Sequence, residues 1–349
     1  VEYMKAAAKK SYLKKGEAVV EMNYKAIDAG VDAIVKIDVP ASWKDAKAEA
    51  KASEVKTNRP EMVKFVNEIL KPVGMMQGDS LPVSVFADMA DGTFPQGSSA
   101  FEKRGVAVDV PEWIPENCIQ CNQCAYVCPH ATIRPFAMSK AEADAAPAST
   151  KKVQMKGKGC EEYTFTMSIS PLDCMGCGLC VKVCPAKEKA LKMVPQESQA
   201  AQQDAFDYTV ATVTKKPTSF SDFTVKGSQF NQPLLEFSGS CAGCAETSYA
   251  RLITQLFGER MYISNATGCS SIWGGSAPAT PYTVNRDSGR GPAWGNSLFE
   301  DNAEHGLGMF LGQKAIRDRL IACVERIAGK TECAELKELC TAYLDTVDD

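Results

Sequence analysis

Fifteen cysteines stand beside only two histidines in this chain of 349 residues. Eight of the cysteines form two copies of one pattern, in which three cysteines are spaced by two residues and a fourth follows after three, directly before a proline. The copies are Cys118, Cys121, Cys124 and Cys128-Pro129, then Cys174, Cys177, Cys180 and Cys184-Pro185. Three such thiolates can wrap one side of a [4Fe–4S] cube, while the fourth cysteine ligates the other cube. The pattern therefore predicts one cluster held by Cys118, Cys121, Cys124 and Cys184, and another held by Cys174, Cys177, Cys180 and Cys128.

Zinc is the main alternative for these eight cysteines, because paired C-x2-C motifs also build tetrahedral four-cysteine sites. Zinc sites use two such pairs, however, and need neither a third cysteine at the same spacing nor a terminal Cys-Pro. Disulfides suit this spacing poorly in a chain whose first residues do not read as a secretory signal. We therefore expect a ferredoxin-like domain that conducts single electrons.

A third C-x2-C pair, Cys241 and Cys244, lies just before a predicted helix, and Cys269 follows at the end of a predicted strand. Iron–sulfur ligation is the favoured interpretation of these three thiols, with zinc, a redox dithiol and simple packing as the alternatives. The fourth ligand would be a distant cysteine or would lie outside this chain.

The remaining cysteines give a weaker signal. Cys323, Cys333 and Cys340 fall in patterns typical of amphipathic helices, so we expect packed thiols rather than ligands. Cys160 stands alone between the two copies and receives no role. His130 follows Cys128-Pro129, and we expect it behind the ligands or at the surface.

Composition excludes several classes of function. Lys and Arg total 39 against 43 Asp and Glu, and the net charge of −4 comes without the polybasic block of a nucleic-acid binder. No segment approaches the roughly 18 uninterrupted apolar residues that a membrane span needs. The sequence therefore predicts neither a nucleic-acid nor a membrane partner.

The elements before the first cysteine copy are predicted from the spacing of apolar residues and from the positions of glycine and proline. A helix around Tyr24–Asp28 ends at Gly30, and the alternating run Ala33–Val39 indicates a strand that ends at Pro40. Ser42 is expected to cap a helix that runs to Glu54, and Asn58 with Pro60 to open another. The apolar positions of this second helix are Met62, Phe65, Val66, Ile69 and Leu70. Dense Pro and Gly over residues 71–105 predict irregular structure with a boundary near Gly97.

After the second cysteine copy, helix and strand alternate again. Residues Glu246–Phe257 carry apolar side chains at helical spacing, and Gly258 and the strand Met261–Ile263 follow. Ligands in open α/β sheets bind beyond the carboxyl ends of strands. This places Asn265, Gly268 and Cys269 where a ligand would be expected.

These residues together resemble the pyruvate:ferredoxin (flavodoxin) oxidoreductases, a family that depends on thiamine diphosphate. Besides the double cysteine motif, the resemblance rests on three runs. They are Cys241-Ala-Gly-Cys-Ala-Glu-Thr, Asn265-Ala-Thr-Gly-Cys-Ser-Ser-Ile-Trp-Gly and Gly291-Pro-Ala-Trp-Gly-Asn-Ser-Leu-Phe-Glu-Asp-Asn-Ala-Glu. The resemblance covers essentially the whole chain and implies a section of a longer polypeptide.

The fold class implied is multidomain, α/β plus α+β. Residues 1–57 would end an α/β domain associated with coenzyme A, and 58–97 would form a small connecting domain. Residues 98–214 would form the ferredoxin-like domain with two [4Fe–4S] clusters and an insertion, and 215–349 the first part of an α/β domain that binds thiamine diphosphate.

The resemblance also implies roles for single residues. Cys241, Cys244 and Cys269 would ligate a third [4Fe–4S] cluster whose fourth ligand lies outside this chain. Glu246 and Cys269 would contact thiamine diphosphate. Asn23, expected at the join of a strand and a helix, is a candidate contact for coenzyme A. The activating glutamate and the Gly-Asp-Gly segment that holds Mg²⁺ are missing, so this section alone is expected to be inactive. His305 stands where the family pattern has an aromatic residue.

The implied reaction is oxidative decarboxylation of pyruvate with coenzyme A to acetyl-CoA and CO₂, with electrons passed to ferredoxin or flavodoxin. The alternatives are another 2-oxoacid:ferredoxin oxidoreductase and a ferredoxin-type electron-transfer subunit. The family leads us to expect a homodimer. Within each protomer, this section would be joined to the rest of the same polypeptide. Oxygen-sensitive clusters favour the cytoplasm of an anaerobic bacterium, with a hydrogenosome as the alternative.

Overall fold

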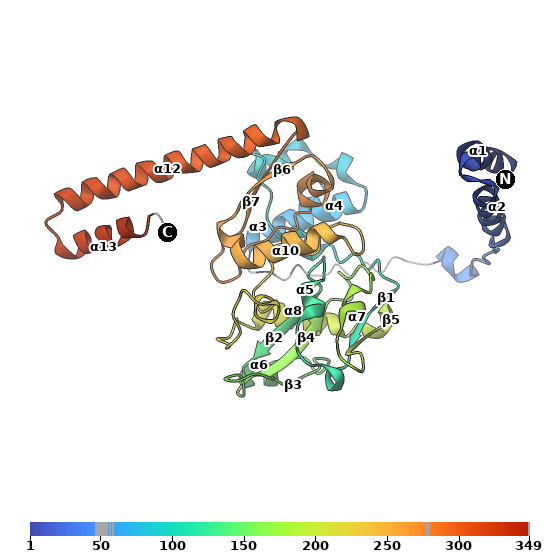
Figure 1. Ribbon diagram of the computed structural model, residues 1–349, viewed down its shortest axis with the longest axis horizontal. Helices are drawn as coiled ribbons and strands as arrows, with labels where there is room; N and C mark the ends of the chain where they lie inside the picture. Colours follow the sequence, from blue (N-terminus) through green and yellow to red (C-terminus); the bar gives the residue numbers. More distant parts are fainter. Residues whose placement is uncertain (46–54, 56, 58, 277–278, 348–349) are drawn as a thin grey trace. The chain divides into compact units, whose positions relative to one another are not determined.

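The computed structural model describes residues 1–45, 55, 57, 59–276 and 279–347. Contacts divide the chain into two units, Val1–Glu54 and Val55–Asp349. The first unit contains the helices α1 (Glu2–Tyr12) and α2 (Glu17–Asp32). They pack against each other, and Lys5 forms an ion pair with Asp28 at 2.7 Å (Figure 1). Gly16 makes the turn between them at a φ of 104°, which favours glycine.

The sequence-based prediction for the end of this unit is wrong. Helix α2 continues through Gly30, and residues 34–40 form no strand. The alternating side chains Ile34, Val35 and Ile37 are 76–77% exposed. A strand needs ladder hydrogen bonds from a neighbour, and no described residue pairs with this segment. The helix expected from Ser42 to Glu54 lies mostly outside the described residues, and Ala41–Asp45 form a 3-10 turn.

The second unit begins with a helix that the sequence predicts correctly. Segments α3 (Pro60–Phe65), a π-helical turn (Val66–Leu70) and α4 (Lys71–Gly74) follow one another without a break. All five predicted apolar residues are buried and form one cluster. Only short 3-10 turns follow, at Gly78–Ser80, Val83–Met89 and Ser98–Phe101.

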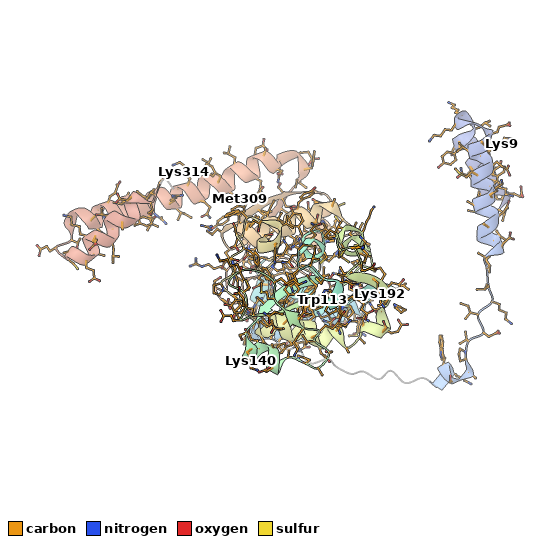
Figure 2. The ribbon with its side chains drawn as sticks, turned by 60° about the horizontal axis from the view of Figure 1, so that its bottom comes forward. Lys9, Trp113, Lys140, Lys192, Met309 and Lys314 are labelled. Carbon is orange, nitrogen blue, oxygen red and sulfur yellow. The ribbon has the colours of Figure 1, made fainter. Side chains whose placement is uncertain are left out.

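Two antiparallel sheets support the cysteine copies. Strand β1 (Asp109–Trp113) pairs with β5 (Leu191–Pro195), and β4 (Thr164–Ile169) lies between β2 (Ile133–Met138) and β3 (Val153–Gln154). The helices here are α5 (Gln123–Tyr126), α6 (Lys140–Ala145), α7 (Leu179–Val183), α8 (Gln202–Thr212) and α9 (Val225–Ser228). Trp113 is 3% exposed within the body of the unit, edge-to-face with Phe165 at 5.9 Å (Figure 2). Both cysteine copies contribute buried thiols to the core around it, which anchors their loops on the sheets.

The last part of the chain is a parallel α/β arrangement. Helix α10 (Ala245–Phe257) leads to β6 (Tyr262–Ala266), which pairs in parallel with β7 (Ala293–Ser297). The short α11 (Cys269–Ser271) follows β6. The long α12 (Asn302–Lys330) has no buried residue, and α13 (Ala334–Asp345) packs on it (Figure 1). The predicted helix and strand around Gly258 are both confirmed.

The late cysteines divide between burial and exposure. Cys340 in α13 is 8% exposed, as expected of a packed thiol. The packing prediction is wrong for Cys333, which is exposed because it caps the start of α13, one residue before the helical face begins. Cys323 is half-buried in α12.

Candidate iron–sulfur site

The two cysteine copies share an unusual backbone conformation. Gln120 and Asn122 flank Cys121 with φ values of 58° and 61°, and Gly176 and Gly178 flank Cys177 with 68° and 69°. This left-handed double turn curls each loop back on its first cysteine. As a result the N–H of Gln120 donates to Cys118 Sγ at 3.4 Å. The first copy thus adopts with non-glycine residues a conformation that costs about 1–2 kcal/mol per residue.

Side-chain hydrogen bonds hold the strained residues of the first copy. Gln120 is 1% exposed, donates to the carbonyl of Gln154 at 2.9 Å and accepts from the N–H of Lys156 at 2.7 Å. Asn122, also 1% exposed, donates to the carbonyl of Lys226 at 2.9 Å. Sequence reasoning missed both residues, because nothing in their type or spacing distinguishes them from other loop residues.

In the second copy, the N–H of Gly176 donates to Cys174 Sγ at 3.4 Å, which repeats the bond of the first copy. A small cavity lies beside this loop. It is lined by four thiols from both copies, those of Cys128, Cys174, Cys177 and Cys180. The chain therefore gathers the four residues that the crossing pattern assigns to one cluster.

The other predicted set is gathered less completely. Charges on Cys118 and Cys121 act on the thiol of Cys124, and so does a charge on Cys180 of the second copy. Cys184 packs half-buried against the core that contains Cys118, and no direct interaction with the other three thiols is described. The three thiols of the first copy therefore lie near enough to interact electrostatically, with Cys180 of the second copy nearby.

Burial governs the protonation of these thiols. It raises the pKa of Cys174 to about 12, and with neighbouring thiolates it raises the pKa of Cys124 and Cys180 well above the usual range. Buried thiolates require compensating positive charge, which bound iron supplies. Across the described ranges, no three His, Cys, Asp or Glu side chains converge as a single metal ion would require. Four thiols around a cavity fit a cluster better than they fit one zinc ion.

The third motif lies against the second copy. Gly243, between Cys241 and Cys244, has a φ of 76°, and its backbone lies close enough to Cys177 to help lower the pKa of that thiol against the larger raising effect of burial. A Cβ at Gly243 would lie 3.6 Å from that of Cys177. Cys241 and Cys269 are exposed and Cys244 is half-buried. No described hydrogen bond or shared cavity joins Cys269, which begins α11, to the other two.

A polar network ties the first copy to the third motif. The ring Nε2 of His130 lies 2.9 Å from the hydroxyl of Ser240, which lies 3.2 Å from that of Thr247 in α10. His130 is 2% exposed, and burial lowers its pKa. It therefore lies behind the ligands in the interior, not at the surface.

Glu102, Lys103 and Arg104 form a second connection, here called the charged clip. Lys103 Nζ lies 2.6 Å from the carboxylate of Asp173, which directly precedes Cys174. Arg104 pairs with Glu102 and donates to the carbonyl of Ser238 at 3.2 Å. The clip joins the segment before the second copy to the segment before the third motif, and sequence reasoning missed it.

The residues expected near thiamine diphosphate lie around α10 and β6. Glu246 is exposed in the first turn of α10, where the positive end of the helix dipole favours a carboxylate. Burial, with the nearby charge of Glu246, raises the pKa of Tyr282 to about 12. His305 in α12 lies 2.7 Å from the hydroxyl of Ser264 in β6.

Asn23 lies elsewhere than expected. The sequence places it at the join of a strand and a helix, whereas it occupies the middle of α2. Its side chain donates to the carbonyl of Val19 one turn earlier, at 2.7 Å. The structural premise of the coenzyme A assignment is therefore wrong, although the contact itself stays a prediction.

Two family models match the chain. Residues 48–107 match a domain of unknown function, which includes the charged clip, and residues 117–188 match the 4Fe-4S dicluster domain. The second match confirms the ferredoxin-like iron–sulfur domain predicted from the two cysteine copies. Within the described residues, no helix is both long and apolar enough to cross a membrane.

Curated relatives cover most of the chain. It is 54% identical over 319 residues to a pyruvate-flavodoxin oxidoreductase of Klebsiella pneumoniae, with 91% of this chain and 26% of the relative covered. It is 50% identical over 349 residues to the pyruvate:ferredoxin oxidoreductase of Moorella thermoacetica, with 100% and 29% covered. A mitochondrial pyruvate dehydrogenase [NADP(+)] of Euglena gracilis is 46% identical over 323 residues, with 91% and 17% covered. The chain thus spans less than a third of each relative.

Proposed function

Because the chain is homologous to one part of the pyruvate-flavodoxin and pyruvate:ferredoxin oxidoreductases, we propose that it is the electron-transfer section of such an enzyme. The complete polypeptide would convert pyruvate and coenzyme A to acetyl-CoA, CO₂ and a proton, and pass two electrons to ferredoxin or flavodoxin. The observation that carries this proposal is the cavity lined by four thiols from both copies, with Gly243 of the third motif packed against Cys177.

The cysteines divide among three proposed [4Fe–4S] sites. One set is Cys118, Cys121, Cys124 and Cys184, and the second set is Cys128, Cys174, Cys177 and Cys180. The third set is Cys241, Cys244 and Cys269, with its fourth ligand outside this chain. Bound clusters would supply one-electron carriers whose potentials depend on charge, hydrogen bonds and exposure. The N–H donors of Gln120 and Gly176 provide such hydrogen bonds.

Contacts between the loops support an order of electron transfer. Gly243 of the third motif lies against Cys177, so the third site lies next to the second set. Cys124 of the first set interacts electrostatically with Cys180 of the second set. We therefore propose that electrons pass from the third site to the second set, then to the first set, and then to the acceptor.

Organic cofactors complete the proposal. Thiamine diphosphate with Mg²⁺ would supply the carbanion chemistry, held largely by the rest of the polypeptide. Glu246 and Cys269 would contact it from this chain, and Asn23 would contact coenzyme A. On the family resemblance we also propose a homodimer in the cytoplasm of an anaerobic bacterium.

Metal analysis tests the cluster assignment. Anaerobically prepared protein of this sequence should contain about eight irons with matching sulfide, which is the content of two clusters. Stoichiometric zinc without iron would overturn the assignment. About twelve irons would mean that this chain itself supplies the fourth ligand of the third site.

Substrate-driven reduction tests the activity in the complete polypeptide. Cys269→Ser should abolish pyruvate-dependent reduction of the other two clusters, whereas Cys333→Ser, at an exposed cysteine outside the three sites, should leave it unchanged. Undiminished reduction in Cys269→Ser would refute the proposed route. Because one relative is named as NADP(+)-linked, flavodoxin, ferredoxin and NADP⁺ should each be tried as acceptor. Faster reduction with a different 2-oxoacid would reassign the substrate.

A further inference from the structure

Arg251 lies in the interior, at the middle of α10. It is 2% exposed, and its guanidinium donates to two backbone carbonyls of the first copy, Cys128 O at 2.9 Å and Tyr126 O at 2.6 Å. It also donates to the side-chain oxygens of Gln229 at 3.0 Å and Gln255 at 2.5 Å. Each of these acceptors is neutral.

The charge of Arg251 has no carboxylate partner. In the described part of the chain, no Asp or Glu forms an ion pair with it, and nearby Arg134 is itself paired with Glu236. Arginine side chains stay protonated in proteins, so the buried guanidinium carries a positive charge. An isolated buried charge is costly unless something of opposite sign compensates for it. Cys128, whose carbonyl accepts from the guanidinium, is a proposed cluster ligand, and a ligating thiolate would supply negative charge beside Arg251.

We propose that Arg251 is a positioning residue that raises the reduction potential of the cluster held by Cys128, Cys174, Cys177 and Cys180. This inference rests on the proposed iron–sulfur function. Reduction adds one electron and one unit of negative charge to the site, and it breaks no bond. A fixed positive charge bonded to the Cys128 carbonyl stabilises that added charge in a medium of low dielectric constant.

Three variants of the complete polypeptide separate charge from shape. Arg251→Gln removes the charge, and Arg251→Lys retains it with fewer hydrogen bonds. Gln229→Glu retains Arg251 but neutralises it with a carboxylate, to which the hydroxyl of Ser228 at 3.0 Å can donate. Arg286→Gln is the matched control, because Arg286 also donates to two carbonyls, those of Val210 and Val213, and contacts no described cysteine.

The readout is the midpoint potential in a redox titration followed by electron paramagnetic resonance. The signal of this cluster is identified as the one that Cys174→Ser removes. We expect Arg251→Gln and Gln229→Glu to make the midpoint potential more negative. The reduction equilibrium should change at least tenfold, which corresponds to about 59 mV for one electron. Arg251→Lys should shift it less, and Arg286→Gln should not shift it.

Each outcome decides the inference. An unchanged midpoint in Gln229→Glu with full iron content would overturn it, even if Arg251→Gln failed to assemble. A shift in Arg251→Gln that Arg251→Lys reproduces in full would assign the effect to lost packing and would also overturn it. Absence of any cluster signal from the unsubstituted protein would refute the proposed function itself, which distinguishes the two failures.

Discussion

Replacing Gly176 and Gly178 separately by alanine places a methyl group at two positions of nearly equal φ but different surroundings. A Cβ at Gly178 would meet no atom within 4 Å. At Gly176 it would lie 3.1 Å from the carbonyl oxygen of Asp109 and 3.3 Å from the Cβ of Ala107, closer than ordinary contact. The pair therefore separates backbone strain from crowding within one loop.

The expected magnitudes follow from these two effects. A left-handed alanine costs about 1–2 kcal/mol, partly offset by about 0.4–1 kcal/mol from the stiffer unfolded chain, so Gly178→Ala should cost about 1 kcal/mol. Gly176→Ala adds overpacking of about 1–3 kcal/mol, which gives about 2–4 kcal/mol in total. It should also weaken the bond from the N–H of residue 176 to Cys174 Sγ and lower the iron content.

The assay is anaerobic denaturation of the complete polypeptide, followed through the visible absorbance of the clusters and compared at the transition midpoint. Iron per polypeptide is measured on the same samples. Equal destabilisation by the two substitutions would refute the reasoning, because the contact with the Asp109 carbonyl would then have no energetic effect.

Three further substitutions test other connections by the same denaturation assay. Gln120→Ala should destabilise the first copy by about 1–2 kcal/mol and lower its iron content, because two partly buried backbone groups lose their partner. Unchanged iron and midpoint would contradict this. Lys103→Met should lower the free energy of unfolding by about 1–3 kcal/mol, because it leaves the buried carboxylate of Asp173 without its cation. The control is Lys140→Met at an exposed ion pair, which should lower it by less than about 1 kcal/mol. Burial alone would raise the pKa of Glu142, but hydrogen bonds from Lys216, Ser139 and Thr214 outweigh it and hold the pKa below its usual range. The stability that Glu142 contributes is therefore present above the pKa of the unfolded state and is lost as the pH falls through the pKa of the folded state. Glu142→Gln should lower the free energy of unfolding by about 1 kcal/mol at pH 7 and by little in acid. A cost that does not change with pH would contradict this prediction.

The sequence allowed the iron–sulfur domain to be predicted because its signal is covalent spacing. Eight cysteines at fixed intervals restrict the chemistry whatever the surrounding fold, and the family match to residues 117–188 agrees. The left-handed backbone conformation of the cysteine loops could be predicted from the sequence only in part. Gly176 and Gly178 suggest a left-handed turn, whereas Gln120 and Asn122 adopt it through buried hydrogen bonds that sequence does not reveal.

Periodicity predicted helix α10 correctly but not which of its faces is buried. Tyr249, Ile253 and Phe257 of the predicted apolar face are 69%, 46% and 47% exposed. Arg251 and Thr254, on the polar side, are each 2% exposed. The spacing of apolar residues indicates which face of a helix prefers burial, whereas burial itself depends on what packs there. The same reason applies to the segment 34–39, whose alternation indicates a strand that has no partner among the described residues.

The polar face of α10 is buried because the cysteine loops offer it polar groups rather than an apolar surface. The carbonyls of Tyr126 and Cys128 face this helix, and a buried carbonyl needs a donor. Arg251 supplies donors from α10, and Thr247 adds a hydroxyl contact, while Gly243 in the loop before the helix lies against Cys177. Helix α10 therefore carries its apolar stripe outward and turns its polar face toward the cysteine loops. Directional hydrogen bonds connect it to the first copy, and such bonds would fix the separation and orientation on which the proposed electron transfer between neighbouring sites depends.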